Sequence, residues 1–79
     1  MNPAAAFGRA LRSFRMSLRL SQERLAQESG LDRSYISLLE RGIRQPSLTT
    51  ILQIAQALNL PARELVAKVE EELLENSKD

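Results

Sequence analysis

The sequence contains neither cysteine nor histidine among its 79 residues. This excludes disulfide bridges, thiol nucleophiles, histidine-dependent catalytic triads and the usual cysteine and histidine ligands of zinc. Apolar runs are also short, at most four residues, so the sequence predicts neither a transmembrane helix nor a signal peptide. We therefore expect a cytoplasmic protein that does not contact membranes and is not an enzyme. No catalytic residue, metal, cofactor or small-molecule ligand is expected.

The remaining composition is that of an ordinary globular domain, with 43% hydrophobic and 27% charged residues. A second hydrophobic core would need roughly twice this length, so we expect one domain over residues 1–79. Charge is unevenly distributed along the chain. Residues 1–44 contain eight arginines and four acidic residues, a balance of +4, whereas residues 45–79 contain three basic and six acidic residues, a balance of −3. The asymmetry favours a polyanionic partner for the first part, although solvated helix faces would give the same composition.

Apolar residues recur at helical spacing in five segments, and no segment alternates as a strand does. Helix starts are predicted at Asn2-Pro3, Ser21, Asp32, Ser47 and Pro61. The third helix is predicted over residues 33–41 and the fifth over residues 61–76. In the fourth, we expect an inward stripe of Leu48, Ile51, Leu52, Ile54, Ala55 and Leu58. These patterns predict an all-α, five-helix domain.

Residues 22–41 carry the most specific pattern. Two short helical segments flank a tight turn at residues 29–32, and the turn contains Gly30. The small Ala26 lies four residues before this glycine, and the apolar Ile36 and Leu39 lie six and nine residues after it. This spacing packs two helices at a steep angle and leaves the second one prominent, able to enter a DNA major groove. The pattern predicts a helix-turn-helix.

Three stretches within and around this window resemble the phage-repressor/Cro-like, or XRE-type, helix-turn-helix family: 20–26 (LSQERLA), 29–37 (SGLDRSYIS) and 39–42 (LERG). The resemblance extends over about residues 7–66. Within the family, the sequence is most similar to the small controller proteins of restriction–modification systems. Arg19 departs from the family pattern, which often has glycine or asparagine between the first two helices.

The resemblance implies sequence-specific binding to double-stranded DNA, with the second helix of the motif in the major groove. Residues expected to read bases are Arg33, Ser34, Ser37 and Leu38. Residues expected to contact phosphates are Gln22, Tyr35, Arg41, Arg44 and Gln45. Without DNA as a partner, the charged members of this set would be solvated surface residues, Tyr35 would be a core-edge tyrosine, and Leu38 would be an incidental exposed leucine.

Two further assignments concern structure and assembly. Family members pair the positions of Arg15 and Glu40 in a partly buried ion pair, so the resemblance implies a structural role for both. The apolar stripe of the fifth helix either folds back on the core or forms a two-fold homodimer interface. The residues expected to dimerise are Ile54, Leu58, Leu65, Val66, Val69 and Leu73. The acidic residues Glu70, Glu71, Glu72 and Glu75 would then lie away from the DNA.

Together these features predict a homodimeric regulator of transcription that acts by promoter occupancy on a pseudo-palindromic operator. Whether it represses or activates stays open, because activation requires a surface for RNA polymerase and no residue identifies one. The alternative is an antitoxin-type helix-turn-helix protein whose C-terminal helix binds a protein partner.

Overall fold

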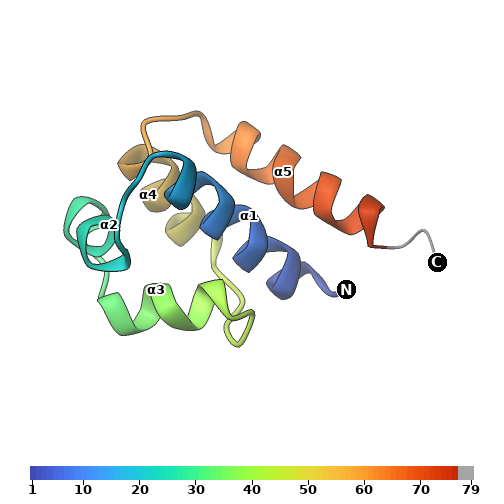
Figure 1. Ribbon diagram of the computed structural model, residues 1–79, viewed down its shortest axis with the longest axis horizontal. Helices are drawn as coiled ribbons and strands as arrows, with labels where there is room; N and C mark the ends of the chain where they lie inside the picture. Colours follow the sequence, from blue (N-terminus) through green and yellow to red (C-terminus); the bar gives the residue numbers. More distant parts are fainter. Residues whose placement is uncertain (77–79) are drawn as a thin grey trace.

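The structure, a computed structural model, describes residues 1–76, so the last three residues of the predicted domain lie outside the described part. The described residues form five helices and no strand (Figure 1). The helices are α1 (Pro3–Ser17), α2 (Gln22–Ser29), α3 (Arg33–Glu40), α4 (Leu48–Ala57) and α5 (Ala62–Glu75). The prediction of an all-α, five-helix fold is confirmed.

Side-chain caps begin three of the helices. Asn2 Oδ1 accepts a hydrogen bond from the third residue of α1 at 2.8 Å, and Ser21 Oγ accepts one from the third residue of α2 at 2.9 Å. Ser47 Oγ caps α4 in the same way at 3.1 Å. These bonds satisfy backbone N–H groups that have no partner within the helix. The predicted starts of α1, α2 and α4 are confirmed.

The predictions for α3 and α5 are each wrong in a local detail. Asp32 occupies the N-cap position of α3, but its side chain makes no capping hydrogen bond. The helix ends at Glu40 instead of Arg41, because the chain then turns through Gly42, whose φ is +72°. Pro61 is the N-cap residue of α5, one position before the first helical residue. Pro61 has no side-chain group that could accept a capping hydrogen bond.

The connection between α1 and α2 passes through Arg19 in the left-handed conformation, with φ of +58°. The Arg19 N–H donates to the Met16 carbonyl, and the Leu20 N–H donates to the Arg15 carbonyl. These two bonds form the usual left-handed termination of a helix, for which glycine is the favoured residue. The chain therefore adopts at Arg19 a geometry suited to glycine or asparagine, even though it carries arginine.

Helix α1 lies in the middle of the fold, beside α5 on one side and α3 on the other (Figure 1). Every helix contributes to one core, whose largest fully buried side chains are Leu11, Leu25, Ile36, Leu39, Ile54 and Leu65. The backbones of α1 and α3 approach closely at Gly8. A Cβ atom there would lie 2.5 Å from the Leu39 carbonyl oxygen and 2.6 Å from that of Glu40. Only glycine permits this approach.

Candidate nucleic-acid interface

Helix α3 has one buried face and one outward face. Ile36 and Leu39 are fully buried, and they fix the helix against the core. The predicted base-reading residues share the opposite face, as their helical spacing requires. Arg33 and Ser34 are exposed, whereas Ser37 and Leu38 are half-buried. The structure thus brings these four side chains together on one surface of a well-anchored helix.

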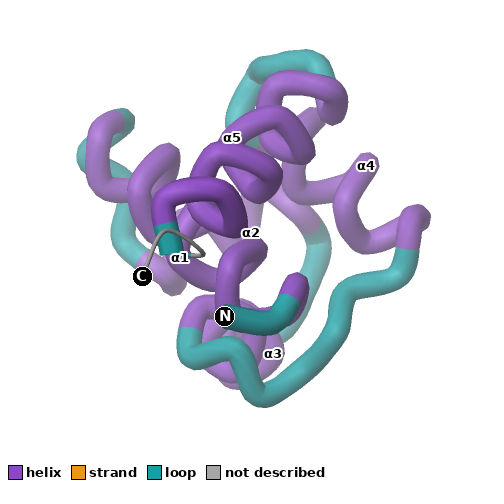
Figure 2. The backbone as a smooth tube through the Cα atoms, turned by 90° about the vertical axis from the view of Figure 1, so that its right-hand side faces the viewer, coloured by secondary structure: helices purple, strands orange, loops and turns teal. Residues whose placement is uncertain are grey.

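The predicted phosphate contacts lie around this helix in different environments. Arg41, Arg44 and Gln45 are exposed in the loop after α3. This loop runs along the outside of the molecule to α4 (Figure 2). Tyr35 is half-buried and packs against the hydrophobic core. Its side chain therefore helps to pack α3 against the core, as a tyrosine at the edge of the core would.

Arg15 and Glu40 meet in a two-pronged ion pair between α1 and the end of α3. Arg15 Nε donates to Glu40 Oε2 at 2.6 Å, and Nη2 donates to Oε1 at 3.0 Å. The side chains are 13% and 4% exposed. The hydrogen bond to Glu40 raises the pKa of Arg15 above its ordinary value; burial opposes this rise and the negative charge of Glu40 adds to it.

Two more hydrogen bonds link this pair to the connection before α2 and to the first residue of α2. Arg15 Nη1 donates to the Leu20 carbonyl oxygen at 2.7 Å, and Gln22 Nε2 donates to Glu40 Oε1 at 3.1 Å. Gln22 is therefore held by Glu40 and does not extend freely into solvent. No local sequence pattern indicates this contact, because Gln22 and Glu40 are 18 residues apart.

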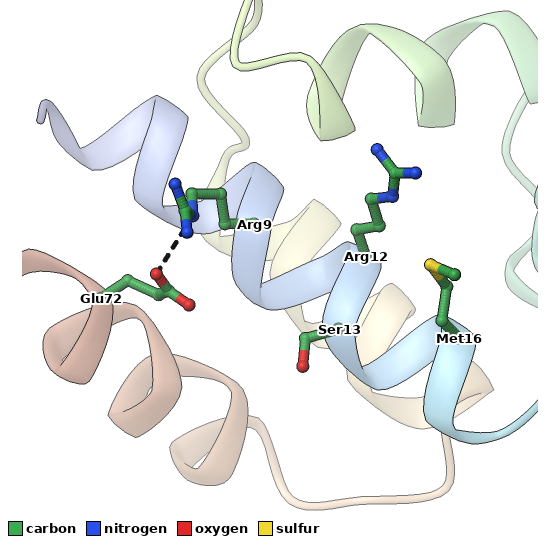
Figure 3. A pocket seen from close by; sticks show the side chains of 5 residues that line it. All are labelled: Arg9, Arg12, Ser13, Met16 and Glu72. Carbon is green, nitrogen blue, oxygen red and sulfur yellow. Dashed lines mark ion pairs between the residues drawn. The ribbon is translucent and has the colours of Figure 1, made fainter.

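A second arginine–glutamate pair joins α1 to α5 (Figure 3). Arg9 Nε lies 3.2 Å from Glu72 Oε2, with side-chain exposures of 59% and 10%. Beside the pair is an open groove of about 450 Å³, lined by Arg9, Arg12, Ser13, Met16 and Glu72. Glu72 is buried, although it belongs to the acidic run of α5. It lies on the side of α5 that faces α1, whereas Glu70, Glu71 and Glu75 are exposed.

The residues predicted to dimerise divide into two groups. Ile54, Leu58 and Leu65 are 0%, 3% and 0% exposed, so they belong to the core of the single chain and cannot contact a second copy directly. The interface expectation is corrected for these three. Val66 is 40% exposed, and Val69 and Leu73 are half-buried on the same stripe of α5.

Helix α4 also departs from the predicted inward stripe. Leu48 and Leu52 are 70% and 52% exposed, and they lie one turn apart on the outer face of α4. They were expected to face the core. Of the predicted stripe, Ile54, Ala55 and Leu58 are buried in the core and Ile51 packs against it, because the core covers only one side of this helix. No helix of residues 1–76 is long and apolar enough to span a bilayer.

Comparisons with known proteins agree with this geometry. The family model described as Helix-turn-helix matches residues 11–65. The control protein C.BamHI from Bacillus amyloliquefaciens is 44% identical over 61 residues, which cover 76% of this chain and 75% of that protein. The crystal structure of the restriction–modification controller protein C.AhdI from Aeromonas hydrophila is similar with a TM-score of 0.77 and 52% identity. It covers 78% of this chain and 94% of that chain.

A further solved structure shows a related chain on DNA. The restriction–modification controller protein C.Esp1396I, crystallised as a tetramer with its natural 35-base-pair operator, is similar with a TM-score of 0.86 and 26% identity. The match covers 94% of this chain and 97% of that chain. Other relatives are longer. The chain spans 44% of the length of an uncharacterized helix-turn-helix-type regulator from Mycobacterium tuberculosis, to which it is 39% identical over 61 residues.

Proposed function

The chain belongs to the helix-turn-helix family, and we propose that it is a sequence-specific, double-stranded-DNA-binding regulator of transcription of the restriction–modification controller type. The observation that carries the proposal is the division of α3 into two faces. Ile36 and Leu39 are fully buried beneath the helix, while Arg33 and Ser34 are exposed above it. A helix anchored in this way can enter a major groove without disturbing the core.

Base recognition follows from the chemistry of the outward face. The Arg33 guanidinium can donate two hydrogen bonds to O6 and N7 of a guanine, a contact worth about 1–3 kcal/mol of discrimination. The hydroxyl groups of Ser34 and Ser37 can donate to or accept from base edges. The half-buried Leu38 offers an apolar surface to the methyl group of a thymine.

Phosphate contacts on both sides of α3 would set its register on the duplex. On one side, Gln22 lies at the first turn of α2, where unpaired backbone N–H groups also favour an anion. On the other side lie the exposed Arg41, Arg44 and Gln45. The Tyr35 hydroxyl would reach a phosphate from the edge of the core. These contacts carry no sequence information but supply affinity.

The active species would be a homodimer on a pseudo-palindromic operator, because one recognition helix reads only a few base pairs. The exposed Val66, with Val69 and Leu73 beside it, offers an apolar stripe on α5, and Leu48 and Leu52 offer a second apolar surface on α4. C.Esp1396I, a chain of similar fold, assembles as a tetramer on its operator. Such a protein would act in the cytoplasm by promoter occupancy, without catalysing a reaction.

Selection of bound sequences from a random duplex pool, at physiological salt, tests this function. We expect a two-fold symmetric consensus, and we expect Arg33→Ala and Ser37→Ala to lose it. Arg63→Ala is the matched control, since it removes an exposed arginine from α5 and should leave the consensus unchanged. Recovery of no consensus, with only weak and salt-sensitive binding, would overturn the proposal and favour a protein partner for the apolar surfaces of α4 and α5.

A further inference from the structure

The hydrogen bonds around Glu40 link the core of the molecule to a side chain expected to touch DNA. We propose that Arg15 and Glu40 are positioning residues for DNA binding, which hold the Gln22 amide in the orientation that donates to a phosphate. This inference rests on the proposed function, and it goes beyond the structural role expected of the ion pair. Its basis is the 3.1 Å hydrogen bond from Gln22 Nε2 to Glu40 Oε1.

The geometry restricts Gln22 through its amide nitrogen. This nitrogen carries two hydrogens, of which Glu40 accepts one, so one N–H group stays available to an incoming phosphate. A glutamine side chain on a surface helix otherwise samples many rotamers, and fixing it on binding costs conformational entropy. Glu40 fixes it before DNA arrives. The phosphate donor is therefore preorganised in the free protein.

Arg15 makes this arrangement possible next to a polyanion. Alone, the Glu40 carboxylate would repel a phosphate that approached Gln22. Arg15 neutralises that charge through two hydrogen bonds at 2.6 and 3.0 Å, and it is itself held by the Leu20 carbonyl oxygen at 2.7 Å. Both carboxylate oxygens of Glu40 thus accept hydrogen bonds from Arg15. The carboxylate cannot turn away from Gln22 without breaking these bonds.

The arginine–glutamate pair between α1 and α5 shows that two helices can be joined by an ion pair without the full set of hydrogen bonds that Glu40 accepts. Glu72 Oε2 lies 3.2 Å from Arg9 Nε but accepts no hydrogen bond from the described residues. If Arg15 and Glu40 had only a structural role, loss of the hydrogen bond from Gln22 to Glu40 would not change the affinity for DNA. The positioning role predicts a consequence, which paired variants can measure.

The decisive comparison uses two variants that each remove the charges of both Arg15 and Glu40. Neither variant therefore leaves a buried charge without its partner. Arg15→Met with Glu40→Gln keeps a carbonyl acceptor for Gln22, whereas Arg15→Met with Glu40→Leu does not. On the consensus duplex we expect the second variant to bind about fivefold more weakly than the first. The first variant keeps the acceptor but loses the hold of Arg15 on it, so its affinity should lie between those of the second variant and the wild type. Adding Gln22→Ala should cost the first variant about the same factor and the second nothing further. Circular dichroism confirms that each variant is folded.

Arg9→Met with Glu72→Leu is the matched control, because it removes the ion pair between α1 and α5 and leaves Gln22 untouched; its DNA affinity should be that of the wild type. Equal affinity of the Glu40→Gln and Glu40→Leu variants would overturn the positioning role while DNA binding stands. A wild-type chain that binds no duplex specifically would overturn the proposed function together with it.

A second measurement, hydrogen exchange, uses only the wild-type protein and so does not depend on whether a variant folds. In the free wild-type protein, the Gln22 side-chain proton that is donated to Glu40 should exchange with solvent more slowly than the other one, and it should stay protected in the DNA complex. Loss of this protection on binding would show that Gln22 leaves Glu40 to reach the DNA, and the positioning role would then be wrong.

Discussion

Helix α1 is joined to α3 and to α5 by the same two residue types, but the two junctions are built differently. At α3, Arg15 and Glu40 are 13% and 4% exposed and form a two-pronged pair. At α5, Arg9 is 59% exposed and approaches Glu72 at 3.2 Å. A buried charge is stabilised only when its partner and its hydrogen bonds are complete, whereas an exposed arginine contributes little. The junction to α3 therefore depends on its ion pair far more than the junction to α5 does.

The backbones show the same contrast. Gly8 lets α1 contact the carbonyl groups at the end of α3, while an open groove of about 450 Å³ lies between α1 and α5. Tight packing leaves a helix few alternative positions. The close approach at Gly8 thus fixes the predicted recognition helix, whereas α5, which has the more extensive contact with α1, leaves part of its apolar stripe exposed.

Breaking the Arg15–Glu40 ion pair between α1 and α3 should have the largest effect. Glu40→Gln leaves the Arg15 guanidinium buried without its charge partner, so we expect the free energy of unfolding to fall by about 3–5 kcal/mol in urea denaturation. Glu72→Gln is the matched variant at the other junction. It frees an arginine that is already largely in solvent, and we expect a change within about 1 kcal/mol. Equal losses in the two variants would contradict the contrast between the junctions.

The close approach at Gly8 should give the next largest effect. Alanine favours a helix over glycine by about 1 kcal/mol, but here its Cβ would meet two backbone carbonyl groups. We expect Gly8→Ala to lower the free energy of unfolding by about 1–3 kcal/mol, measured by thermal and urea unfolding. Gly30→Ala is the control without a steric clash, because no atom lies within 4 Å of the added Cβ and only its φ of +74° is unfavourable. A Gly8→Ala variant more stable than the wild type would show that α1 and α3 separate easily.

The smallest effect is expected at Arg19, where the chain leaves α1 and leads to the Leu20 carbonyl that Arg15 binds. Arg19 has a φ of +58°, which glycine adopts without the steric cost of a Cβ atom. Glycine relieves this steric cost but also increases the conformational entropy of the unfolded chain, which opposes the gain. We expect Arg19→Gly to stabilise the protein by about 0.5 kcal/mol as the net result. Arg19→Ala removes the same charge but keeps the Cβ atom, so it should bring no such gain. Equal thermal midpoints of the two variants would contradict strain at this residue.

Most of the fold could be predicted from local signals. The caps at Asn2, Ser21 and Ser47 and the terminating Gly30 are where the sequence indicated, because each acts on backbone groups three or four residues away. The errors at Asp32 and Pro61 concern single capping positions and leave the helices in place. The contact between Arg15 and Glu40 came from the family resemblance and not from any local pattern.

The candidate site was predictable only in part. The helical period alone places Arg33, Ser34 and Ser37 opposite the buried Ile36 and Leu39. The same period could not show that Ile54, Leu58 and Leu65 are buried in the core of the single chain. An apolar stripe has the same sequence pattern whether it packs against its own chain or against another one.

The sequence by itself determined the five helices, their approximate ends and the outward face of α3, because capping, turning and periodicity act within a few residues. Only the tertiary structure decided which polar side chains are buried and what they bind. The helical period sets Glu72 on the face of α5 that carries the buried Leu65, seven residues earlier, but it does not identify Arg9 as the partner of Glu72. Gln22 has no neighbour in sequence that would hold it. Burial and hydrogen bonding of such groups depend on helices that meet from distant parts of the chain. The packing of α1 against α3 and α5 therefore determines which partner Glu72 has and whether a hydrogen bond holds Gln22.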